Sequence, residues 1–218
     1  MHTYLLYLHI LGGTISLILG LVPIISKKGG MLHKTTGRIF GIAMLTATFS
    51  GVVLAVIKPE QTLFLVGLFS SYLVIAGILP LRLMGPQQLN TIKKALILPT
   101  LGIMLAVAML LFAVYHLIQG NAEGIVVGVF GLGLLTSALA DYKWISRFTE
   151  TTRSQLISIH VGRIVGAYIA SCTAFLVVNQ PIPVPIVNWF IANVVFVPVI
   201  VYWQRKLANS KQVVPVAQ

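Results

Sequence analysis

A small number of ionisable side chains lie inside or beside long apolar runs of this sequence, and they are its candidates for chemistry. In the run 158–178, His160 and Arg163 share one helical face with small residues. A charged side chain at membrane depth costs about 2.5–3.5 kcal/mol on insertion scales, so it marks a functional site and needs a partner. Asp141, at the end of the preceding apolar run, is the partner that we predict for Arg163.

His33 and Arg38 stand before the second apolar run, on the side of the membrane where we also place Asp141 and Arg163. The sequence therefore predicts one cytoplasmic-side polar cavity, and its ligand-binding residues would be His33, Arg38, Asp141, His160 and Arg163. The arginines would supply fixed positive charge, and the histidines would adjust their protonation near neutral pH. Such a cavity fits transport or binding of a small anionic solute or a proton. The alternative is a charge pair that only locks two helices together.

Four histidines also permit a different hypothesis, a b-type haem electron carrier. His33 and His160 belong to the inner leaflet, whereas His9 and His116 belong to the outer leaflet. Each haem takes two axial imidazoles from different helices, and two haems can pass an electron across a bilayer. A zinc or copper site is not predicted, because two imidazoles and one carboxylate at unrelated positions have no recognisable ligand spacing.

A third hypothesis is a membrane scaffold or assembly factor without a ligand. No catalytic residues are predicted, and the sequence does not decide whether any reaction is catalysed. It leaves the oligomeric state open as well.

The composition requires that lipid is the main solvent of this chain. Hydrophobic residues make up 57% of its 218 residues and charged ones only 9%, a balance that a soluble domain does not have. The formal net charge of +11 does not indicate a nucleic-acid partner, because the basic residues form small clusters between apolar runs. This distribution is typical of loops that face a cytoplasm and the anionic lipid headgroups of a bilayer. The single cysteine, Cys172, excludes an intramolecular disulfide.

Seven apolar runs have the length of a membrane span, and they predict an all-α integral membrane bundle of seven transmembrane helices. The runs are 3–25, 39–57, 62–83, 95–118, 125–144, 158–178 and 185–203. All Lys and Arg residues except Lys58 and Arg163 fall in alternate connections or in the C-terminal tail. Because cytoplasmic segments collect Lys and Arg, this alternation predicts an N-terminus outside and a cytoplasmic C-terminus.

The connections are short, so we predict a single transmembrane domain over residues 1–208 and a flexible cytoplasmic tail over 209–218. The first run lacks the basic start of a secretory signal and reads as a retained helix. Pro80, Pro99 and Pro198 lie within the predicted helices, where each is expected to produce a kink. Gly124 and Gly128, four residues apart, are expected to let two helices approach closely.

Several motifs give the chain a family resemblance. The stretch 27–40, KKGGMLHKTTGRIF, and the later HVGR at 160–163 followed by TAFLVVN at 173–179 resemble the signatures of a bacterial family of polytopic membrane proteins catalogued as a domain of unknown function. The likeness extends from Leu8-His9-Ile10 to the closing YWQRK at 202–206. It implies a multi-pass protein of the bacterial cytoplasmic membrane. It implies no activity.

Overall fold

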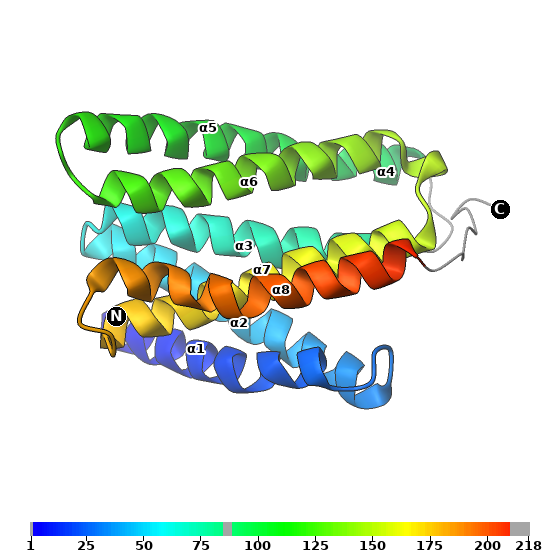
Figure 1. Ribbon diagram of the computed structural model, residues 1–218, viewed down its shortest axis with the longest axis horizontal. Helices are drawn as coiled ribbons and strands as arrows, with labels where there is room; N and C mark the ends of the chain where they lie inside the picture. The colour runs from blue at the N-terminus through cyan, green and yellow to red at the C-terminus, as the bar shows by residue number, and fades with distance from the viewer. Residues whose placement is uncertain (1, 85–88, 210–218) are drawn as a thin grey trace. The chain divides into compact units, whose positions relative to one another are not determined.

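The computed structural model describes residues 2–84 and 89–209, and in these ranges it is all-helical. The helices are α1 (His2–Ile25), α2 (Met31–Ile57), α3 (Gln61–Arg82), α4 (Leu89–Ala95), α5 (Ile97–Ile118), α6 (Glu123–Ser146), α7 (Arg153–Asn179) and α8 (Pro185–Ala208), with a short 3-10 turn η1 (Phe148–Glu150) between α6 and α7 (Figure 1). Within the described part of the chain, seven helices are long and apolar enough to cross a membrane. The predicted seven-helix membrane fold is therefore confirmed. Of the predicted tail, residues 210–218 lie outside the described residues.

Several helices extend beyond the apolar runs that predicted them. Helix α2 begins at Met31 instead of residue 39, so Lys34 and Arg38 lie on its first turns and not in a loop. Helix α7 begins at Arg153 and α8 continues to Ala208. Outside the hydrocarbon core a helix still satisfies its backbone hydrogen bonds, although its side chains are polar. Hydropathy therefore finds the part of a helix that lies in lipid and misses its ends.

Two of the three predicted proline positions lie inside helices, Pro80 in the last turn of α3 and Pro198 in α8. Pro99 lies instead in the first turn of α5, directly after a turn at Leu96 that separates α4 from α5. The first backbone N–H groups of a helix have no intrahelical acceptor, so proline costs little there. The expected kink at Pro99 is thus a break between two helices.

The chain forms two compact units by its internal contacts. The first contains residues 1–74 and 164–200, and the second contains residues 75–163 and 201–218, in each case as far as they are described. The divisions fall within α3, α7 and α8 and not within loops.

In the first unit, α1 and α2 pack with their backbones in close contact. A Cβ atom built on Gly12 would lie 2.8 Å from the carbonyl oxygen of Ala43 and 3.1 Å from the backbone nitrogen of Ala47. Only a residue without a side chain permits this separation. Further along α1, the ring of Tyr168 from α7 fills the space over Gly20, and its hydroxyl donates to the carbonyl of Leu17 (3.1 Å).

In the second unit, α5 and α6 form an antiparallel pair joined by a short connection (Figure 1). A Cβ on Gly124 would lie 2.7 Å from the carbonyl oxygen of Ala113, and one on Gly128 would lie 3.4 Å from the Cβ of Ala113. The expected close approach is therefore confirmed at Gly124, whereas a Cβ at Gly128 would make only an ordinary van der Waals contact. Gly120 has a φ of 72° in the connection, a conformation that suits glycine.

Candidate functional site

Asp141 of α6 and Arg163 of α7 form a buried ion pair. The Nε–H of Arg163 donates to Oδ2 of Asp141 (3.1 Å), and an Nη2–H donates to Oδ1 (3.0 Å). The side chains are 2% exposed for Asp141 and 14% exposed for Arg163. This two-point geometry is the strongest form of an arginine–carboxylate contact. The predicted partner of Arg163 is therefore confirmed.

Further hydrogen bonds fix both members of the pair. The second Nη2–H of Arg163 donates to the backbone carbonyl of Ser137 (2.9 Å), one turn before Asp141 on α6. The indole Nε1–H of Trp144 donates to Oδ1 of Asp141 (3.0 Å). A guanidinium carries five N–H groups, and these described contacts use three of them. The two N–H groups on Nη1 are the part of Arg163 that the pair does not use.

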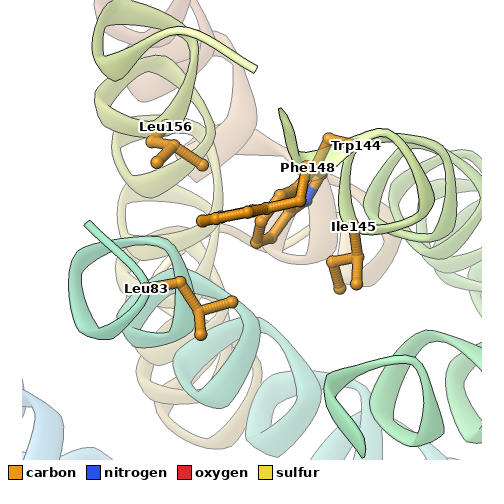
Figure 2. Close-up of a cluster of buried hydrophobic side chains, with 5 residues drawn as sticks. All are labelled: Leu83, Trp144, Ile145, Phe148 and Leu156. Atoms are coloured by element: carbon orange, nitrogen blue, oxygen red, sulfur yellow. The ribbon is translucent and has the colours of Figure 1, made fainter. Parts of the chain in front are cut away.

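An apolar cluster lies next to the ion pair, and Trp144 connects the two because it belongs to the cluster and donates to Asp141. The cluster consists of Leu83, Trp144, Ile145, Phe148 and Leu156, whose side chains come together from the turn directly after α3, from α6 and η1, and from the start of α7 (Figure 2). The buried hydroxyl of Thr151 donates to the carbonyls of Trp144 and Arg147, which holds the turn between α6 and α7. Apolar packing beside an ion pair keeps water from competing for its hydrogen bonds.

His160 lies one helical turn before Arg163 on α7 and bonds to a different helix. Its Nδ1 lies 2.8 Å from the backbone carbonyl oxygen of Gly77 in α3. Because a carbonyl can only accept, Nδ1 must carry the proton. Within four residues, α7 is thus hydrogen-bonded to α3 through His160 and to α6 through Arg163.

His33 and Arg38, the other two predicted ligand-binding residues, lie in the first unit. Nδ1 of His33 bonds to the carbonyl of Pro23 (3.1 Å) at the end of α1, and the ammonium of Lys28 donates to the same oxygen (2.6 Å). Burial lowers the pKa of Lys28. The two side chains satisfy a carbonyl that the helix leaves without a partner, a role that suits cations at a helix C-terminus. Arg38 is exposed on α2.

The five predicted ligand-binding residues thus divide between the two units. The structure brings Asp141 and Arg163 into contact and places His160 one turn away. The cavity that would unite them with His33 and Arg38 stays a prediction.

The two histidines of the outer pair have different hydrogen-bonding roles. Nδ1 of His9 bonds to the carbonyl of Ala47 (2.8 Å) and therefore carries a proton. At His116, the amide Nδ2 of Asn121 donates to Nδ1 (3.2 Å), while the Oδ1 of Asn121 accepts from the backbone of Glu123. In neutral His116 the proton must then be on Nε2. Among the described residues, no group of three or more His, Cys, Asp or Glu side chains could hold a metal ion.

No family model, curated protein or solved structure matches the chain. The resemblance to a bacterial membrane family therefore stays a prediction.

Sequence reasoning missed several residues that shape the site. Trp144 stands three residues after Asp141 on a helix, and this spacing was a signal that the indole lies near the carboxylate. Gly77, Ser137 and Pro23 contribute backbone carbonyls, which any residue type possesses, so their sequence gives no signal of the role. The one sequence signal was Pro80, three residues after Gly77, because a proline in a membrane helix leaves a backbone carbonyl that needs a donor from elsewhere.

Proposed function

We propose that this multi-pass membrane protein binds a small anionic solute at Arg163, on the side of the membrane that the basic residues predict to be cytoplasmic. The observation that carries the proposal is that the bonds to Asp141 and Ser137 use only Nε and Nη2 of Arg163. The two N–H groups on Nη1 are not part of these bonds, and the side chain is 14% exposed. Donors at membrane depth need an acceptor, and an anion is the best one for a guanidinium. We further propose that the bound solute is transported, alone or together with a proton.

The geometry favours a small anion with a single negative charge. The edge of the guanidinium formed by Nε and Nη2 is occupied by Asp141, and the second Nη2–H is occupied by Ser137. The remaining Nη1 offers no two-nitrogen fork of the kind that recognises phosphate. Asp141 also neutralises much of the charge of Arg163, so a divalent anion gains less here than at a lone arginine. Nitrate, chloride or a short carboxylate fits these conditions.

Nitrate titration of the purified protein in detergent tests this proposal, with sodium gluconate keeping the ionic strength constant. A bound anion raises the midpoint of thermal unfolding, by an amount that corresponds to about 2.7 kcal/mol at a hundredfold excess over Kd. Arg163→Lys keeps the positive charge and removes Nη1. We expect it to weaken nitrate binding about 10–100-fold, the effect of one lost hydrogen bond to a charged group.

Lys143→Gln is the matched control, because Lys143 is exposed and lies two residues from Asp141 on the same helix. Screening makes its charge weak at Arg163, so nitrate affinity should stay within about twofold of the original. If nitrate gives no shift in the unmodified protein, or Arg163→Lys leaves the shift unchanged, the ion pair is only a lock between α6 and α7. With a positive result, nitrate flux into proteoliposomes separates transport from binding alone.

A haem-bearing electron carrier is the second candidate, and the proton positions of two histidines favour it. In His9 and His33, Nδ1–H donates to a backbone carbonyl, so Nε2 carries the lone pair in each neutral ring. This is the arrangement that metal-ligating histidines use, since the carbonyl orients the ring. His116 does not fit, because Asn121 donates to its Nδ1. The candidate axial ligands therefore narrow from four histidines to His9, His33 and His160.

An absorption spectrum of the protein purified from haem-replete cells tests this candidate. If haem is bound, we expect a Soret band that is weakened or lost when at least one of His9, His33 and His160 is replaced by alanine, and that is kept in His116→Ala. A colourless preparation excludes a haem carrier and leaves the anion site untouched.

A further inference from the structure

Besides Arg163, α7 directs His160 to a neighbouring helix, and this histidine meets the backbone of α3 beside a proline. The Nδ1 of His160 lies 2.8 Å from the carbonyl oxygen of Gly77, 83 residues away in the sequence. Pro80 stands three residues after Gly77 inside α3, and its side chain is fully buried. Both partners and the proline belong to the second unit.

A proline inside a helix weakens the turn that precedes it. Pro80 has no N–H for the carbonyl of Ala76, and its ring crowds that carbonyl, so the turn that contains Gly77 is weaker than a regular helical turn. In a membrane no water is available for such groups, so the protein itself must supply donors. His160 provides an N–H at this turn.

The position of His160 on α7 connects this bond to the candidate site. His160 and Arg163 are three residues apart, so their side chains leave the helix on the same face. Arg163 is fixed to α6 by Asp141 and Ser137. A rotation of α7 that breaks one of these contacts also displaces the other.

We infer that His160 is a positioning residue: its Nδ1–H bond to Gly77 holds α7 against the proline-containing turn of α3 and so sets where Nη1 of Arg163 lies. The effect on Nη1 rests on the proposed anion site, whereas the bond to the proline-containing turn does not. The bond to α3 and the effect on Arg163 are therefore measured in separate experiments.

Three substitutions at position 160 and one at position 80 test the inference. His160→Asn places an amide N–H where Nδ1 stands, His160→Gln places it one bond further out, and His160→Ala removes it. Hydrogen exchange over residues 75–84, read as peptides, reports the bond to α3 without any ligand. We expect exchange there to rise about fivefold to tenfold in His160→Ala and His160→Gln, and less than twofold in His160→Asn. Exchange in α5 should stay unchanged.

Nitrate affinity reports the effect on Arg163. It should fall about fivefold in His160→Ala and recover in His160→Asn. His116→Ala is the control, because this histidine lies on α5 and bonds to Asn121, so neither measurement should change. If nitrate does not bind the unmodified protein, the anion site fails while the exchange measurement still decides the role of the bond.

Pro80→Ala supplies the missing N–H to α3 and closes the weakened turn. In that background, His160→Ala should raise exchange over residues 75–84 by less than half the factor seen with Pro80 present. The inference is overturned if His160→Asn behaves like His160→Ala, if exchange rises equally throughout the second unit, or if Pro80→Ala leaves the effect of His160→Ala unchanged.

Discussion

Asp141→Ala is expected to lower the free energy of unfolding by about 3–5 kcal/mol, the cost of removing one partner from a buried ion pair. The carboxylate of Asp141 accepts two N–H groups from Arg163 and one from Trp144. Without it, a guanidinium that is 14% exposed loses its counter-charge among apolar side chains. Unfolding in mixed detergent micelles, followed by circular dichroism, measures the loss.

Glu123→Gln is the control for this experiment, because Glu123 is an exposed acid in the first turn of the same helix. Its charge favours the helix N-terminus by at most about 1 kcal/mol, so the loss should be no larger. The double variant Asp141→Ala, Arg163→Ala should lose less than the two single variants added together, since the second substitution removes the uncompensated charge. A loss below about 1 kcal/mol in Asp141→Ala contradicts a buried, water-excluded pair.

Gly12→Ala is expected to destabilise the protein by about 1–3 kcal/mol, whereas Gly13→Ala is expected to be neutral or to stabilise it by up to about 1 kcal/mol. The new Cβ at position 12 would lie 2.8 Å from the carbonyl oxygen of Ala43, which is backbone and cannot rotate away. A Cβ at position 13 meets nothing within 4 Å. Both substitutions replace a helical glycine by alanine, so their difference isolates the close approach of α1 and α2.

The same unfolding measurement compares the two alanine variants. Equal effects at positions 12 and 13 would show that α1 and α2 are not in backbone contact at Gly12. A substitution at His9 could not replace this comparison, because it would also remove the hydrogen bond from His9 to the carbonyl of Ala47.

The fold could be predicted because the bilayer imposes a simple requirement on composition. Each span needs about twenty apolar residues, and the seven runs satisfy this requirement wherever the helices cross lipid. The ends of α2, α7 and α8 could not be predicted, because water and headgroups satisfy polar side chains there whether or not the backbone stays helical. The turn at Leu96 was missed for a different reason: a continuous apolar run reads as one span even when it contains a break.

The ion pair was predictable because lipid does not solvate an unpaired charge. Arg163 needs a partner at its depth, and Asp141 was the nearest acid in the preceding apolar run. The bonds of His33 and His160 could not be predicted, because their acceptors are backbone carbonyls of Pro23 and Gly77. Which carbonyl a histidine meets depends on how helices pack, and the packing is not encoded in any single span.

The division of the chain into two units has a consequence for biosynthesis. The first unit combines α1 and α2 with residues 164–200, so its early helices enter the membrane long before their later partners are made. Until α7 arrives, Gly20 of α1 and Phe40 of α2 lack the ring of Tyr168, which packs against both. Nascent chains that end before residue 164 are therefore expected to leave the surface of α1 and α2 around Gly20 and Phe40 without its packing partner.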